Sequence, residues 1–236
     1  MKILSLDSTA KTATVSVCDD NASICVYSVN AGLNHSETLL PMVENVLKNS
    51  HLTVDDIDMF AISEGPGSFT GVRIGVSLIK GLAFGKNKLC VGVSTLEALA
   101  YNLKGFCGII CPVMDARREQ VYNALFMCDG ENIVRLTEDR AIPLSELEKE
   151  LKEKYADKNI YFCGDGYDVT VKNINIRFCD TPHLLREQNA YSVAVLALKK
   201  YNDNKEDDYS DKNLKPTYLR VPQAERERLE RLNNKN

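Results

Sequence analysis

The chain has 236 residues, of which 44% are hydrophobic and 26% charged, which is the composition of a globular protein and excludes wholesale disorder. Its formal net charge of −4 lacks the basic excess that is typical of proteins that bind nucleic acid directly. No apolar run reaches the roughly 18 residues of a membrane span, and Asp7 comes too early for a signal peptide. We expect one or two domains, in the cytoplasm, with no membrane association.

The first 103 residues alternate between strand and helix patterns. Short β-rich runs separated by turn residues predict a three-stranded meander at 3–6, 13–18 and 23–29. Asn34 then stands three positions before Glu37, as in a capping box, and apolar residues follow at helical spacing. The rest of this half predicts strands at 57–63 and 89–93 and helices at 72–84 and after Ser94, which completes the order βββαβαβα.

The second half repeats this order in a shorter form. Strands are predicted at 109–114, 121–127, 133–136, 160–163 and 174–178, and helices around 144–151 and 191–201. The order of elements therefore indicates a duplicated α/β unit. The polar run 202–212 is expected to be a mobile linker, and 224–232 a charged, solvated helix or a partner-docking peptide.

Two loops are candidates for binding an anion. Asp7 and Ser8 end the first strand, where a carboxylate and a hydroxyl could meet a metal-bound phosphate or simply satisfy turn amides. Residues 65–75 read Gly-Pro-Gly-Ser-Phe-Thr-Gly-Val-Arg-Ile-Gly, and glycines before a helix allow close approach to an anion, with Gly67 and Ser68 as contacts. This stretch lacks the Gly-Lys-Ser/Thr ending of a P-loop. An anion site and a tight structural turn therefore both remain open.

Other polar residues give weaker indications. Arg117 follows a predicted strand and is either a further anion contact or the partner of Asp115 in an exposed ion pair. The eight cysteines form no C-x-x-C pair, and the three histidines are isolated. We expect buried free thiols, no metal site and no cofactor, because structural zinc needs four converging nitrogen or sulfur ligands.

Five segments carry a resemblance to a known family: residues 35–41, the loop 65–75, residues 94–100, residues 115–118 with 121–122, and residues 216–220. Together they resemble the TsaB family of bacterial tRNA threonylcarbamoyladenosine biosynthesis subunits, and GPGSFTGVRIG is the most specific string. The resemblance implies an α/β fold of two tandem actin/Hsp70-like ATPase domains (the ASKHA, RNase H-like class). Each domain would hold a mixed sheet flanked by helices, over residues 1–103 and 104–236, with the second abbreviated.

The same resemblance implies that the catalytic centre is absent. The TsaB family is paralogous to the catalytic TsaD family, in which two histidines at i and i+4 after the glycine loop bind the active-site metal. Thr95 and Leu99 occupy those two positions here. Leucine cannot ligate a metal, so the resemblance implies no catalytic residue and no enzyme activity of the chain's own.

A scaffold role follows from the resemblance. It implies binding to a TsaD-like catalytic subunit that transfers threonylcarbamoyl to the N6 amine of the adenosine beside the tRNA anticodon. It also implies a TsaE-like ATPase as a further partner, tRNA contact only indirectly, and a homodimer through the same helices when the chain is alone. The interface candidates on these two helices are Leu39, Leu40, Val43, Arg73, Val76 and Ile79. On this basis Val76→Glu is expected to abolish the complex and leave the monomer folded.

Two alternatives stay open. The first is an ATPase, kinase or metallopeptidase-like enzyme on the same fold, opposed by the lack of a glycine in the turn after Asp7 and by the missing histidine pair. The second is a direct tRNA-binding protein, opposed by the acidic balance. Metal content and ATP turnover of the isolated chain separate the first from the scaffold, and salt-dependent binding of tRNA separates the second.

Overall fold

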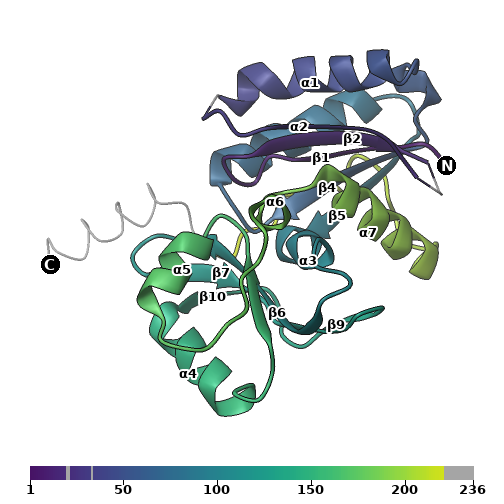
Figure 1. The fold of residues 1–236 in the computed structure, drawn as a ribbon. Coiled ribbons are helices and arrows are strands. Elements are labelled where there is room, and N and C mark those ends of the chain that lie inside the picture. The colour runs from purple at the N-terminus through teal and green to yellow at the C-terminus, as the bar shows by residue number, and fades with distance from the viewer. Residues whose placement is uncertain (20–21, 33, 221–236) are drawn as a thin grey trace, which may run out of the picture.

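The computed structural model describes residues 1–19, 22–32 and 34–220. Two mixed β-sheets, each flanked by helices, follow one another along the chain (Figure 1). The α/β fold class expected from the sequence is confirmed. The expected helix at 224–232 lies outside the described residues.

The first sheet has five strands in the order β3-β2-β1-β4-β5. β1 (Ile3–Asp7), β2 (Ala13–Cys18) and β3 (Ser23–Val29) form the predicted antiparallel meander. β4 (Met59–Gly65) and β5 (Leu89–Ser94) extend it in parallel with β1. The carboxyl ends of three parallel strands therefore meet at one edge of the sheet, where Asp7 and the glycine loop lie.

Helices cover both faces of the first sheet (Figure 1). α1 (His35–Asn49) and α2 (Phe69–Ala83) pack side by side on one face over a shared apolar core, and the short helix η1 (Val54–Asp56) follows α1. α3 (Thr95–Tyr101) and α7 (Ala190–Asp203) cover the other face. Because α7 comes from the far end of the chain, the core of the first sheet includes residues from both halves of the sequence.

The second sheet has six strands. β6 (Cys107–Asp115) pairs with β7 (Gln120–Asn123), β8 (Phe126–Asp129) and β11 (Ile160–Cys163), while β9 (Ile133–Arg135) and β10 (Arg140–Pro143) occupy the edges. α4 (Leu144–Lys154) and α5 (Tyr167–Asn173) pack on one face, and α6 (His183–Arg186) leads towards α7. The other face packs on Leu96, Leu99 and Leu103, so α3 is enclosed between the two sheets.

Three expectations for the second half are wrong. The single strand expected at 121–127 is two strands, β7 and β8, which pair with different parts of β6. The segment 174–178 is not a strand, because the structure forms α5 before it and only an isolated bridge between Tyr161 and Cys179 after it. The run 202–212 is not a free linker either, since Tyr209 is buried and its carbonyl accepts a hydrogen bond from the Cys90 amide at 2.8 Å. The division into domains 1–103 and 104–236 stays a prediction.

Candidate functional site

The glycine loop is explained by contacts with other parts of the chain. A Cβ at Gly71 would lie 2.0 Å from the Ser8 carbonyl oxygen, and a Cβ at Gly67 would lie 2.5 Å from that of Thr9. A Cβ at Gly75 would meet the Ser8 hydroxyl at 2.4 Å. Because these three glycines have no side chain, the turn after β1 can lie directly against the start of α2.

Hydrogen bonds lock the loop to this turn. The Ser68 amide donates to the Thr9 carbonyl at 2.7 Å, and the Ser8 hydroxyl donates to the Gly71 carbonyl at 2.9 Å. The Ser68 side chain accepts from the Gly71 amide at 3.3 Å and caps α2. The Ser68 and Gly71 amides and the Ser8 hydroxyl therefore already have partners within the chain, as in a tight structural turn. Anion contacts at Asp7, Ser8, Gly67 and Ser68 stay predictions.

Residues of the C-terminal segment 216–220 also contact the glycine loop. Gly65 has a φ of +123°, and a Cβ there would lie 2.2 Å from the Thr217 carbonyl oxygen. The Thr217 amide donates to the Glu64 carbonyl at 2.7 Å, and the Tyr218 ring stacks on Phe69 with centroids 4.4 Å apart. The segment 216–220, which the resemblance singled out, thus anchors the loop.

Asp7 is buried at the end of β1, with only 1% of its surface exposed. Its Oδ1 accepts from the amide and the hydroxyl of Thr9, at 2.8 and 2.7 Å, and the Ser63 hydroxyl also interacts with this carboxyl. Burial raises the pKa of this carboxyl, and its hydrogen bonds and nearby His35 offset part of that rise. The ionised form therefore costs folding free energy.

This burial predicts how Asp7→Asn changes stability with pH. Because the folded-state pKa is raised, the wild type loses stability as the pH rises from the unfolded-state pKa through the folded-state pKa. The asparagine keeps the acceptor for Thr9 without the charge, so the variant is expected to be more stable than the wild type at pH 7, with a flatter profile above pH 4. Urea unfolding across this range measures both, and a variant that is less stable at pH 7 contradicts the expectation.

Arg117 lies at a turn of unusual backbone conformation between β6 and β7. Arg117, Arg118 and Glu119 have φ values of +66°, +56° and +56°. The Arg117 amide donates to Asp115 Oδ1 at 2.7 Å, and its guanidinium lies 3.9 Å from Asp115 Oδ2. The Arg117 side chain is 81% exposed, so this ion pair contributes little. An anion contact there stays a prediction.

The two positions that the resemblance aligns with metal-binding histidines, Thr95 and Leu99, lie in the core. Thr95, at the start of α3, is completely buried, and Leu99 is 1% exposed within the cluster between the two sheets. The Leu99 carbonyl accepts from the Cys163 thiol at 3.5 Å, and burial raises the pKa of that thiol. Within the described part of the chain, no three His, Cys, Asp or Glu side chains converge so that they could hold a metal ion.

The structure divides the six interface candidates into two groups. Leu39, Val43, Val76 and Ile79 are 0–3% exposed and form the core between α1, α2 and the sheet. Leu40 is 46% exposed, and Arg73 is exposed, with its guanidinium 3.9 Å from the Phe69 ring centroid. The four buried residues cannot meet a partner in this conformation, and Val76→Glu would place a charge in the core.

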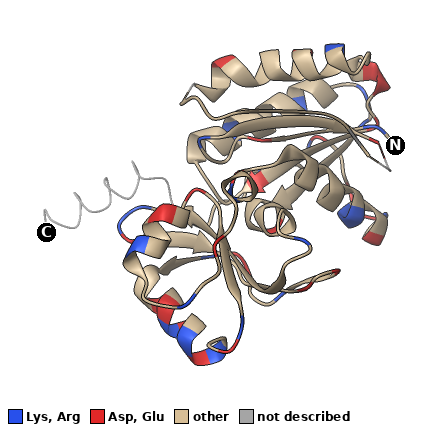
Figure 2. Cartoon of the chain, viewed as in Figure 1, with Lys and Arg blue, Asp and Glu red and all other residues tan. Residues whose placement is uncertain are grey.

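Of the residues that face outward on α2, sequence reasoning named Arg73 but missed Ile74 and Ser77. Arg73, Ser77 and Gly81 are exposed and Ile74 and Leu78 are half-buried, at helical spacing. A Cβ at Gly81 would meet nothing within 4 Å, so this glycine borders open space. We call Leu40, Arg73, Ile74, Ser77 and Gly81 the α1–α2 face. In Figure 2 the charged residues gather on α4, whereas α1 and the adjoining α2 are mostly uncharged.

Comparisons with known proteins agree with this architecture. The family model described as "TsaD: tRNA N6-adenosine threonylcarbamoyltransferase" matches residues 28–228. The "tRNA threonylcarbamoyladenosine biosynthesis protein TsaB" of Bacillus subtilis is 35% identical over 164 residues, 70% of this chain and 71% of the relative. The Escherichia coli protein of the same name is 34% identical over 149 residues, 62% of this chain and 64% of the relative. The solved structure "YeaZ from Pseudomonas aeruginosa" superposes with a TM-score of 0.77 at 23% identity, over 92% of this chain and 99% of that one.

Fold and matches define the class: an α/β protein of two mixed sheets flanked by helices, related over most of its length to threonylcarbamoyltransferases. The chain belongs to the TsaB family. The resemblance found in the sequence is therefore confirmed. Among the described residues, no helix combines the length and the apolar character needed to cross a membrane.

Proposed function

We propose that the chain serves tRNA threonylcarbamoyladenosine formation as a non-catalytic scaffold for a TsaD-like catalytic subunit. One observation carries this proposal: the segment that matches the metal-binding segment of the TsaD family is the core helix α3, with Leu99 packed between the two sheets. An isobutyl group in an apolar cluster can neither ligate a metal nor polarise a substrate. The chemistry then belongs to the partner, and this chain supplies a surface.

The α1–α2 face is the surface that we propose for this contact. Its residues are accessible, and the small side chains of Ser77 and Gly81 allow another helix to approach closely. α2 has only two charged residues, Arg73 and Lys80, so covering it desolvates little charge. Lys80 donates to the Leu214 carbonyl at 3.2 Å and is already engaged within the chain. The same face serves a homodimer when no partner is present.

The proposed assembly has two further members. A TsaE-like ATPase supplies ATP hydrolysis, so this chain needs no nucleotide of its own. tRNA is held mainly by the partners, which agrees with the net charge of −4. The transfer to the N6 amine of the adenosine beside the anticodon takes place in the catalytic subunit.

Assays of the isolated chain test the non-catalytic role. Alone, it is expected to bind no stoichiometric metal, to hydrolyse no ATP in the steady state, and to transfer no threonylcarbamoyl group from its adenylate to tRNA. Metal analysis, phosphate release and tRNA nucleoside analysis measure these three quantities. Steady turnover by the isolated chain, or a tightly bound metal at one per chain, would favour the enzyme alternative.

A further inference from the structure

A cavity of about 190 Å³ lies where the second half of the chain meets the helices of the first. The β8–β9 hairpin, α3 and α7 supply most of its lining. Its apolar lining includes Phe126 and Ile133 from the hairpin, Tyr101 from α3 and Val195 from α7. A cavity of about 150 Å³ holds benzene in another protein, so this space suffices for a molecule of that size.

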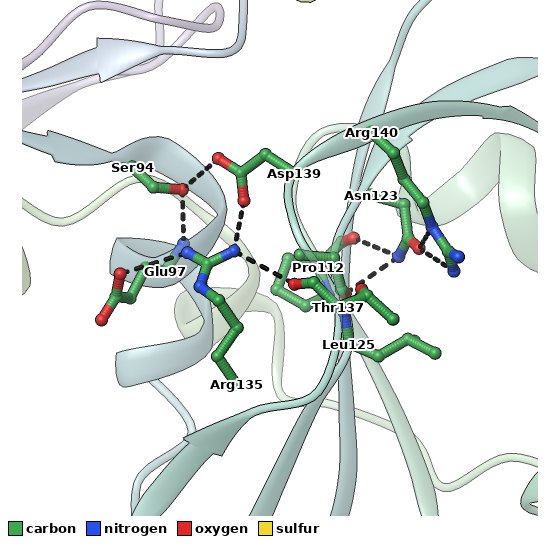
Figure 3. A network of polar contacts seen from close by, with 10 residues as sticks. Ser94, Glu97, Pro112, Asn123, Leu125, Arg135, Thr137, Asp139 and Arg140 are labelled. Carbon is green, nitrogen blue, oxygen red and sulfur yellow. Dashed lines mark hydrogen bonds and ion pairs between the residues drawn. The ribbon is translucent and has the colours of Figure 1, made fainter.

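The positive charge of Arg135 on the cavity lining is already neutralised by acidic residues of the chain. Arg135 donates hydrogen bonds to Glu97 of α3 at 3.1 Å and to Asp139 at 2.5 Å (Figure 3). Its guanidinium lies 4.7 Å from the Phe126 ring centroid. Asp139 in turn accepts from the Ser94 hydroxyl at 2.5 Å. These contacts join β9 to α3 and hold the wall in a fixed geometry. Arg135 therefore forms part of the cavity wall and is not available to bind the charged group of a ligand.

Two other cations on the lining have no such partner. Lys104, just after α3, lies 5.6 Å from the Tyr101 ring centroid, and Lys199 is on the last turns of α7. Among the described residues, neither lysine forms an ion pair, and Glu131 on the hairpin forms none either. Of the charged lining residues that form no ion pair among the described residues, two are positive (Lys104 and Lys199) and one is negative (Glu131). A space with both apolar and polar lining, and with a surplus of ammonium groups that form no ion pair among the described residues, fits an anion with an apolar body.

We propose that this cavity binds a small organic carboxylate with a ring-sized apolar body. The body would lie between Tyr101, Ile133 and Val195, and the carboxylate would meet the ammonium groups of Lys104 and Lys199. Because the walls come from both halves of the chain, the bound molecule would also hold the β8–β9 hairpin against α3 and α7. The proposal does not depend on the scaffold role, so either can fail alone.

Benzoate is the probe, and benzyl alcohol is its neutral analogue. Titration of the full chain followed by amide NMR is expected to show saturable one-to-one binding of benzoate with a Kd on the order of 1 mM. The shifts should centre on Tyr101, Ile133 and Val195. Benzyl alcohol lacks the charge and is expected to bind about ten-fold more weakly.

Charge variants decide whether the two lysines recognise the carboxylate. Lys104→Gln and Lys199→Gln are each expected to weaken benzoate binding about three-fold and the double variant about ten-fold, while binding of benzyl alcohol stays unchanged. Lys172→Gln on α5 removes an exposed lysine far from this lining and serves as the matched control. Equal affinity for both probes, a double variant that binds benzoate like the wild type, or shifts centred elsewhere would overturn the proposal. So would an absence of saturation at ten times the expected Kd.

Discussion

Gly71→Ala is expected to destabilise the protein by about 3 kcal/mol or more, which corresponds to a fall in Tm of roughly 6–12 °C for a chain of this size. The new Cβ would lie 2.0 Å from the Ser8 carbonyl oxygen, a backbone atom that cannot move aside alone. Either the β1–β2 turn or the start of α2 must shift, and the bonds of Ser8 and Ser68 would break with it.

Gly81→Ala on the same helix is the matched control. A Cβ at Gly81 meets nothing within 4 Å, so only helix propensity changes, and the variant is expected to gain about 0.5–1 kcal/mol. Thermal and urea unfolding of both variants measure the contrast. A Gly71→Ala protein as stable as the wild type would mean that the turn and the loop are not locked together.

Ser77→Glu is expected to leave the monomer folded and to weaken binding to the TsaD-like subunit by at least about ten-fold. Ser77 is exposed at the centre of the α1–α2 face, and a carboxylate there would be buried without a partner in a helix-to-helix contact. Leu40→Glu tests the α1 side of the same face. Size-exclusion co-elution and a titration of affinity measure the loss.

Two neighbouring substitutions give this prediction its controls. Val76→Glu puts the charge one residue away, where the side chain is 3% exposed, and is expected to unfold the chain rather than to block docking. Ser145→Glu repeats the serine substitution at an exposed position on α4 and is expected to bind normally. Full binding by Ser77→Glu and Leu40→Glu would remove the α1–α2 face as the contact.

The elements set by local patterns could be predicted from the sequence. The meander, α1, α4 and α7 follow from alternation or helical spacing within each segment. The apolar residues Ile174, Ile176 and Phe178 stand at every second position, which indicates only that one side of that segment packs against the core. These side chains pack on the core of α4 and α5, and the segment finds no strand to pair with beyond the bridge at Cys179.

The candidate site was harder to predict because it depends on contacts between distant residues. The role of Gly71 depends on Ser8, 63 positions earlier, and that of Gly65 depends on Thr217. An apolar helical stripe identifies a buried face without saying whether the chain's own sheet or a partner covers it. The stripe alone therefore points to Val76 and Ile79 as interface residues, although both belong to the core. Small size does not separate the two sides either, since Gly71 and Gly75 face the β1–β2 turn whereas Ser77 and Gly81 are exposed.

Reconstitution of tRNA modification tests the central claim most directly. Purified TsaD-like and TsaE-like proteins, tRNA and the threonylcarbamoyl donor are combined with and without this chain, and the modified nucleoside is quantified. The scaffold role predicts modification only when the chain is present, with Ser77→Glu unable to replace it and Ser145→Glu fully active. Equal modification in its absence would contradict the role, and modification by this chain without the TsaD-like subunit would show that it is itself the enzyme.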